Sequence, residues 1–103
     1  MIESLYQRRI ISIIRELFPG CIVLKNDAGY LQGIPDIIIL YENTWAALEF
    51  KRHTKSSRRP NQDYYVELLD SMSFASFIYP ENEEDVLHDL QLTFGISEPT
   101  RIS

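Results

Sequence analysis

Residues 33–51 read GIPDIIILYENTWAALEFK, two apolar runs separated by a short polar break. The first run, Ile34 to Tyr41, is rich in β-branched side chains, and the second extends from Thr44 to Phe50. Apolar runs of this length on either side of a short turn predict an antiparallel β-hairpin, here turning at residues 42–43. This hairpin is the centre of the predicted fold.

The predicted hairpin brings two acids and a lysine onto one surface. With the turn centred on residues 42–43, Asp36 lies directly opposite Glu49, and facing Cβ atoms in such a pair are about 4.5–5.5 Å apart. Strand alternation then puts Lys51 on the same face as Glu49. An odd number of loop residues would move every facing pair by one position, so the arrangement depends on this register.

Two neighbouring carboxylates and a lysine are typical of a divalent-cation site with a water nucleophile. Mg²⁺ takes one or two carboxylates and keeps several waters, which leaves room for phosphate oxygens. The alternative is a surface salt bridge between Lys51 and one of the acids, which contributes little to stability. The apolar sequence around the acids argues against that alternative, because it predicts a partly buried face. Two adjacent charged carboxylates on such a face are destabilising without a cation.

At these residues the chain resembles the PD-(D/E)XK nucleases, and more closely their VRR-NUC branch, which is common in phages and bacteria. The resemblance spans about residues 3 to 80 and rests on Pro35-Asp36, Glu49-Phe50-Lys51 and Gln62, in that order. Family members carry an acid in the first helix, a G-x-P-D strand, an E-x-K strand and a glutamine at the start of the next helix. The E-x-K piece alone says little, and the ordered combination makes the resemblance specific.

The resemblance implies metal-dependent hydrolysis of DNA phosphodiester bonds on a restriction-endonuclease-like α/β core. Asp36, Glu49 and the Phe50 carbonyl would bind Mg²⁺ or Mn²⁺, and an acid of the first helix would complete the shell. Lys51 would position the attacking water and offset the charge that builds on the phosphorane. Gln62 would orient phosphate, water or the Lys51 amine, although a glutamine in a first turn can also simply satisfy a free backbone N–H.

Helical phase distinguishes the two acids of the first predicted helix, Glu3 to Phe18. At 100° per residue, Glu3 lies within about 20° of both Ile10 and Ile14, on the apolar stripe. Glu16 falls on the opposite side of the helix. We therefore expect Glu3 to reach the metal, directly or through water, and the alternative is an N-terminal acid favoured by the helix dipole.

The sequence predicts one α/β domain over residues 1–95, built on a mixed four-stranded sheet flanked by helices. Two further strands are predicted at Cys21 to Lys25 and at Ser73 to Tyr79. The second of these follows a helical crossover from the hairpin, which is right-handed if the two strands are parallel. Residues 96–103 are expected to form a loose tail.

Two more helices are predicted after the hairpin. The crossover helix starts at residues 57–59 with Pro60 in its first turn, and an acidic helix covers about Asn82 to Thr93. Trp45, Tyr64 and Tyr65 are interpreted as packing residues, because they lie in apolar periodic runs. The residues expected to face the core are Tyr65, Leu68, Leu69 and Met72 in the crossover helix and Val86, Leu87 and Leu90 in the acidic one.

The net charge of −5 argues at first against a nucleic-acid partner, because phosphate contacts need Lys and Arg. Residues 81–89, however, contain five acids and no Lys or Arg, so the rest of the chain is neutral. Basic residues cluster from Lys51 to Arg59 and predict a phosphate-binding strip, the alternative being a solvated surface loop. The predicted DNA contacts are Arg52, His53, Lys55, Arg58 and Arg59, with Lys25 before the hairpin.

Size bounds the expected assembly. A chain of 103 residues has no room for a second domain and carries one metal site, so paired cuts need two copies. Small junction-resolving enzymes, which the chain resembles, work as two-fold dimers. We therefore expect a homodimer on branched DNA such as four-way junctions, joined through the third helix or through the first, with Tyr6 and Ile13 off its core stripe.

The sequence shows no signal peptide and no apolar stretch of membrane-spanning length, which predicts a protein of the cytoplasm of a bacterium or a phage-infected host. Cys21 has no companion for a disulfide or a zinc site and is interpreted as a partly buried thiol. Three other functions stay open, because one fold can host unrelated activities. They are an inert nucleic-acid-binding or assembly module, a non-nuclease metal hydrolase and an RNA-cleaving enzyme.

Overall fold

The central hairpin forms in the computed structural model of the chain, which describes residues 3–101. β2 (Ile37–Tyr41) pairs antiparallel with β3 (Thr44–Phe50). Ile37 lies opposite Leu48, so the turn is centred on residues 42–43 and the predicted register is confirmed.

The same register, continued by one residue, places Asp36 opposite Glu49. β2 itself begins three residues later than predicted, and Asp36 immediately precedes it. Pro35 has no N–H to donate to a ladder, and the N–H of Ile34 bonds to the Leu31 carbonyl at 3.2 Å. The backbone before Asp36 is therefore occupied by a turn and not by a strand.

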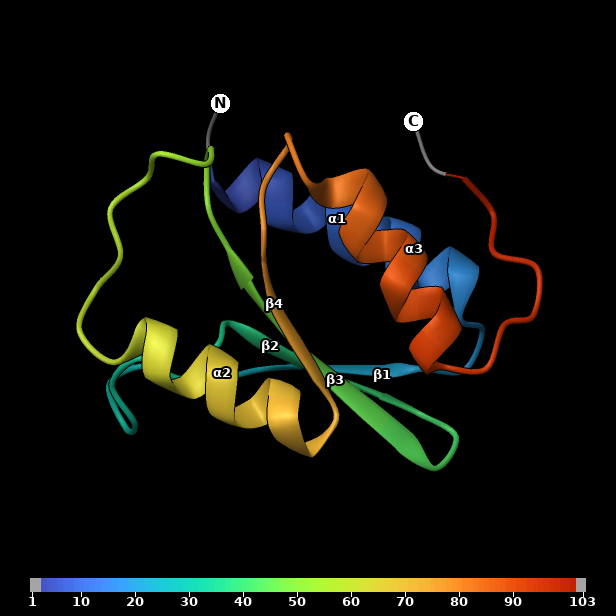
Figure 1. Cartoon of the computed structure of the whole chain (residues 1–103), viewed down its shortest axis with the longest axis horizontal. Helices are drawn as coiled ribbons and strands as arrows, with labels where there is room; N and C mark the ends of the chain where they lie inside the picture. The colour runs from blue at the N-terminus through green and yellow to red at the C-terminus, as the bar shows by residue number, and fades with distance from the viewer. Residues whose placement is uncertain (1–2, 102–103) are drawn as a thin grey trace.

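Two further strands complete a mixed open sheet of order β1-β2-β3-β4 (Figure 1). β1 (Ile22–Lys25) is antiparallel to β2 and forms one edge. β4 (Phe74–Ile78) is parallel to β3 and forms the other edge. The mixed four-stranded sheet is confirmed, although β1 and β4 are slightly shorter than predicted.

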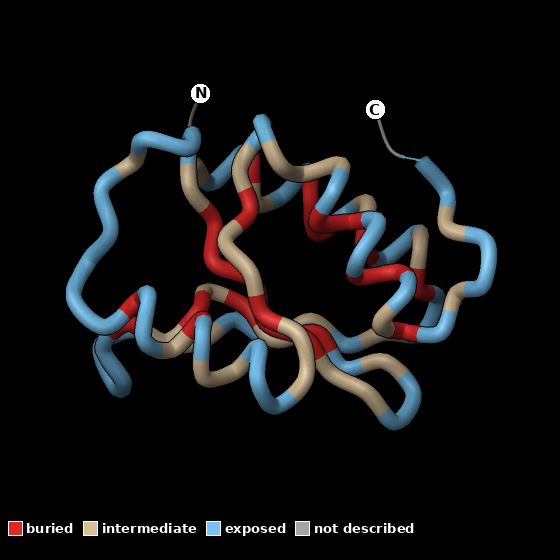
Figure 2. Tube along the Cα trace, viewed as in Figure 1, coloured by how far each residue is buried: buried red, intermediate tan, exposed pale blue. Residues whose placement is uncertain are grey.

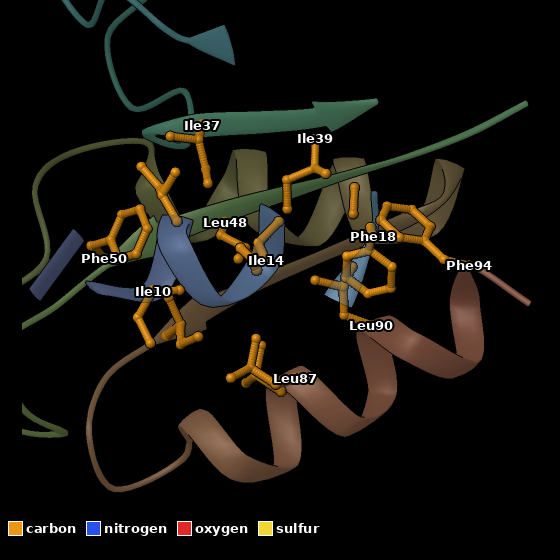
Figure 3. Packing of buried hydrophobic residues seen from close by; sticks show 14 of the residues in the cluster. Ile10, Ile14, Phe18, Ile37, Ile39, Leu48, Phe50, Leu87, Leu90 and Phe94 are labelled. Atoms are coloured by element: carbon orange, nitrogen blue, oxygen red, sulfur yellow. The ribbon is translucent and has the colours of Figure 1, made fainter. Parts of the chain in front are cut away.

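Helices cover both faces of the sheet (Figure 1). α1 (Glu3–Leu17) and α3 (Glu83–Thr93) pack on one face, and α2 (Gln62–Met72) packs on the other. β3 lies between these layers, and its residues from Ala46 to Phe50 are all buried (Figure 2). Figure 3 shows the side chains that form the main core under α1 and α3: Ile10, Ile14, Phe18, Ile37, Ile39, Leu48, Phe50, Leu87, Leu90 and Phe94.

The buried face of α1 is wider than its sequence predicts. Tyr6 is only 1% exposed, and its hydroxyl donates a hydrogen bond to Glu83 of α3 at 3.1 Å. Ile13 is partly buried against the main core. The prediction that Tyr6 lies off the core stripe is wrong, because the neighbouring α3 covers it, and Tyr6 is therefore not available to a dimer contact.

α2 also differs from its prediction. Asn61 has a left-handed φ of 70°, so Pro60 lies outside the helix and Gln62 is its first residue. The side facing the sheet carries Gln62, Val66 and Leu69, opposite the small side chains of Ala47 and Ala75. Of the four residues predicted to face the core, Tyr65, Leu68 and Leu69 are partly buried, whereas Met72 is 63% exposed. Tyr64, which was interpreted as a packing residue, is 60% exposed.

Residues 96–101 are attached to α3, in contrast to the expectation of a loose tail. The buried amide of Gln91 donates to the Thr100 carbonyl at 2.9 Å and accepts from the Thr100 N–H at 2.8 Å. Ile96 packs against the main core. Among residues 3–101, no helix combines the length and the apolar character needed to cross a membrane.

Candidate active site

A hollow of about 930 Å³ opens where the central hairpin ends. Two loops line it: the residues between β1 and β2, named here the 26–36 loop, and the residues between β3 and α2, the 51–61 loop. Both loops lie at the left of the molecule in Figure 1, and the first turns of α1 and α2 close the hollow. Its charged and amide lining residues are Glu3, Gln7, Gln32, Asp36, Glu49, Lys51, Arg52, His53, Arg59 and Gln62.

Asp36 and Glu49 share the floor of the hollow. The Asp36 carboxylate accepts a hydrogen bond from the Phe50 N–H at 2.8 Å, which fixes it across the end of the hairpin. Glu49 is only 4% exposed. Burial, and next the nearby charge of Asp36, raise the pKa of Glu49 to about 8, although Lys51 acts in the opposite direction. The positive charge of Lys51 therefore does not compensate for the burial of the Glu49 carboxylate beside Asp36.

The oxygen atoms at this point fit a hard divalent cation. Asp36 and Glu49 supply two carboxylates, and a cation between them would relieve the repulsion that raises the pKa of Glu49. The N–H and C=O of one strand residue point the same way, so the Phe50 carbonyl faces the side on which its N–H meets Asp36. Within residues 3–101, no three His, Cys, Asp or Glu side chains are placed to hold an ion together.

Gln62 links Lys51 to Glu49. The Lys51 amine donates to Gln62 Oε1 at 2.7 Å, and Gln62 Nε2 donates to Glu49 Oε2 at 3.0 Å. Gln62 Oε1 also accepts from the Arg59 N–H at 2.9 Å, so it satisfies a backbone group before the helix as well. The Lys51 amine makes a second bond to the Ser57 carbonyl at 3.1 Å and lies 3.9 Å from Glu49 Oε2. The amine is thus held in a fixed position beside the two acids.

The first helix contributes Glu3 to the wall of the hollow. Glu3 lines it together with Asp36 and Glu49, and its charge is one of the lesser factors that raise the pKa of Glu49. Glu16 is exposed and does not line the hollow. The structure therefore places the two acids as helical phase predicts, with Glu3 lining the same hollow as the carboxylate pair.

The basic residues divide into two groups. Arg52, His53 and Arg59 line the hollow beside Lys51. Arg58 turns away from it, because its guanidinium pairs with Asp63 at 2.6 Å and lies 4.1 Å from the centre of a phenylalanine ring in β4.

Two other predicted DNA contacts lie outside the lining. Lys25 is exposed at the end of the edge strand β1, and Lys55 is exposed in the 51–61 loop. The predicted basic strip is therefore not continuous, and its part nearest the acids consists of Lys51, Arg52, His53 and Arg59.

Gly33 explains how the two loops meet. Its φ is +90°, and a Cβ built on it would lie 2.6 Å from the Asn61 Cβ, 2.7 Å from the Asn61 carbonyl carbon and 2.9 Å from the Pro60 oxygen. The backbone of the 26–36 loop therefore contacts the start of α2 directly, and only glycine fits there. The G-x-P-D pattern contained this signal, but no pattern in the sequence indicated which segment Gly33 approaches.

Gly33→Ala is expected to lower the free energy of unfolding by about 2–4 kcal/mol, because left-handed strain adds to a clash with backbone. Gly20→Ala is the matched control: Gly20 has a φ of +89° but nothing within 4 Å of a built Cβ. That control should lose about 1–2 kcal/mol. Urea unfolding followed by circular dichroism measures both, and equal losses would show that the loops do not touch at Gly33.

Comparisons of the chain with models of known protein families, with curated proteins and with solved structures found no match. Function is therefore inferred from the side chains of the hollow. They combine a carboxylate pair, a lysine fixed by Gln62, and three further basic residues of the 51–61 loop.

Proposed function

We propose that the protein is a Mg²⁺- or Mn²⁺-dependent endonuclease of the PD-(D/E)XK type, with a restriction-endonuclease-like core, that hydrolyses phosphodiester bonds of DNA. The observation that carries the proposal is the hydrogen-bonded chain from Lys51 through Gln62 to Glu49, beside Asp36. A carboxylate pair of which Glu49 is buried, with a fixed lysine beside it, suits phosphodiester hydrolysis better than a structural role, because a buried charge next to a like charge is destabilising. The resemblance to the VRR-NUC branch supports the same conclusion.

Each residue then has a defined task. Asp36, Glu49 and the Phe50 carbonyl would hold the cation, with Glu3 reaching it through water. When bound, the cation would offset negative charge on the scissile phosphate and lower the pKa of a bound water. The Lys51 amine, held by Gln62, donates to the attacking water and offsets negative charge that develops on the phosphorane. Arg52, His53 and Arg59 hold neighbouring phosphates.

The acidic third helix is compatible with a nucleic-acid partner. Glu83 pairs with Arg9 at 2.7 Å, and Glu84 pairs with Arg101, so two of its acids are already partnered by cations. Neither glutamate lines the hollow. These acids of the third helix therefore lie away from the basic residues that line the hollow.

An inert binding or assembly module is the main alternative. Such a module would gain nothing from a Glu49 carboxyl whose pKa burial raises to about 8. A non-nuclease hydrolase and an RNA-cleaving enzyme would both keep the acids. The substrate panel below distinguishes them.

Cleavage of labelled linear, flap and four-way DNAs, and of matched RNAs, with Mg²⁺, Mn²⁺ or EDTA tests the proposal. We expect metal-dependent cuts within DNA and the highest rate on branched substrates. The proposal includes a homodimer that nicks paired strands of a junction, which light scattering and strand-specific mapping measure. Cleavage in EDTA, or no cleavage of any nucleic acid with either metal, would contradict the nuclease assignment.

Glu3→Gln should reduce metal-dependent cleavage at least about tenfold, because removal of an outer-shell metal partner typically has that effect. Glu16→Gln is its matched control, since it makes the same change on the exposed side of the same helix. The control should keep the original rate and metal dependence. If both variants lose the same activity, the first helix does not direct Glu3 to the metal.

A further inference from the structure

Tyr30 is the most exposed large hydrophobic side chain described, with 90% of its surface accessible. It lies in the 26–36 loop, and the neighbouring Leu31 is 39% exposed. The residues on both sides of this pair, Gly29 and Gln32, line the hollow. Tyr30 and Leu31 therefore form an apolar tip at the rim of the hollow, where they contribute little to the core.

The tip is held by a network of local hydrogen bonds. The N–H groups of Tyr30 and Leu31 both donate to the Asp27 carbonyl, at 3.0 and 3.2 Å, and the Gly29 N–H donates to Asp27 Oδ1 at 2.8 Å. The Asp27 side chain is thus hydrogen-bonded to the backbone of its own loop. The close approach of Gly33 to the start of α2 holds the other side of the loop.

The base of the same loop is fastened to the residues that immediately precede β2, which include Asp36. The Asn26 N–H donates to the Asp36 carbonyl and the Asn26 amide donates to the Pro35 carbonyl, both at 2.8 Å. Asp36 and the aromatic tip are therefore positioned by one closed loop. The tip therefore lies beside the hollow that contains Asp36, between two residues that line it, Gly29 and Gln32.

We propose that Tyr30 is a base-stacking residue, and that the substrate of the hollow carries an unpaired base next to the scissile phosphate. This inference rests on the proposed nuclease function and specifies its substrate class. A paired base already stacks within the duplex and presents no free face, whereas an unpaired base exposes one to the tyrosine ring. Selection of branched over fully paired DNA would then arise at Tyr30 and not at the carboxylates.

The test measures binding rather than cleavage. A DNA duplex with a short unpaired segment that contains 2-aminopurine reports stacking through its fluorescence, and a fully paired duplex of equal length is the reference. Ca²⁺ replaces Mg²⁺, since both are held by carboxylate oxygens, and gels confirm that the probe stays intact. The variants are Tyr30→Ala, Tyr30→Trp and, as matched control, Tyr64→Ala, which removes a tyrosine that is 60% exposed outside the hollow.

Tyr30→Ala should weaken binding of the unpaired probe by about five- to a hundredfold and abolish its fluorescence change, whereas binding of the paired duplex stays within about twofold. Tyr30→Trp should retain both signals, and so should Tyr64→Ala. Unchanged affinity in Tyr30→Ala, or an equal loss in Tyr64→Ala, would overturn the inference and leave the nuclease proposal standing. Failure of the original protein to bind either DNA would overturn both.

Discussion

Lys51→Ala is expected to lower the single-turnover cleavage rate by about three orders of magnitude while the fold remains intact. The Lys51 amine is fixed by Gln62 and by the Ser57 carbonyl at the edge of the carboxylate pair. In the proposed mechanism, charge on the phosphorane would develop there. Removal of one preorganised donor of this kind typically reduces kcat by about 10²–10³. Because the proposed mechanism assigns the lysine to the transition state, substrate binding should largely survive.

The two carboxylates should behave in the same way. Asp36→Asn keeps an acceptor for the Phe50 N–H, and Glu49→Gln keeps one for Gln62, so both variants should fold. Each removes a charge that the cation needs, and each should lose most of the activity.

Arg8→Ala is the matched control for these variants. Arg8 is an exposed cation of α1 outside the lining of the hollow, so its loss should leave the rate unchanged. Circular dichroism confirms folding in every variant. Full activity of Lys51→Ala would show that another group positions the water.

The central hairpin was predictable because its signals are local. The polar break at residues 42–43 sets the register, and strand alternation then decides which side chains share a face. Asp36, Glu49 and Lys51 consequently meet as predicted. The acidic helix was predicted for the same reason, since Val86 and Leu90 follow a helical period within one short segment.

The remaining features depend on partners that lie far away in the sequence. Tyr6 is buried because α3 covers it, and Glu83 of that helix, 77 positions later, accepts its hydroxyl hydrogen bond. Arg58 does not line the hollow with the other basic residues, because its guanidinium pairs with Asp63 and lies over the Phe77 ring. Gln62 occupies the buried face of α2, where periodicity favours an apolar residue, because Lys51 and Glu49 satisfy its amide. A pattern reports which positions are apolar, but not which segment covers them.

Mg²⁺ binding is expected to strengthen about tenfold for each pH unit between about 6 and 8, and to level off above that. The cause is Glu49, whose carboxyl keeps its proton up to a pKa of about 8 and must release it before it can hold a cation. Calorimetry in buffers of different ionisation enthalpy should therefore detect close to one proton released per ion at pH 7. In Glu49→Gln the slope should disappear, and an unchanged slope would assign the titration to another group.

The raised pKa of Glu49 also predicts how the stability of the metal-free protein depends on pH. The folded-state pKa of Glu49 is raised above its ordinary value of about 4.3, so the folded protein binds the proton more tightly than the unfolded chain. This contribution to stability is fully present below about pH 4 and is lost as pH rises toward 8, by about 1.4 kcal/mol per pH unit. Glu49→Gln does not titrate, so in EDTA it should become more stable than the original protein by a few kcal/mol at pH 8.

Subtraction of the two urea unfolding curves isolates Glu49 together with its interactions with the neighbouring charges of Asp36, Lys51 and Glu3, because every other titrating group is common to both proteins. Mg²⁺ should restore the stability of the original protein at pH 8 and have little effect on Glu49→Gln, since only the carboxylate needs a cation to compensate its burial. A stability difference that stays flat between pH 5 and 8 would mean that the Glu49 pKa is ordinary. The carboxylate pair would then tolerate both charges without a cation, and its need for a metal would lose its physical basis.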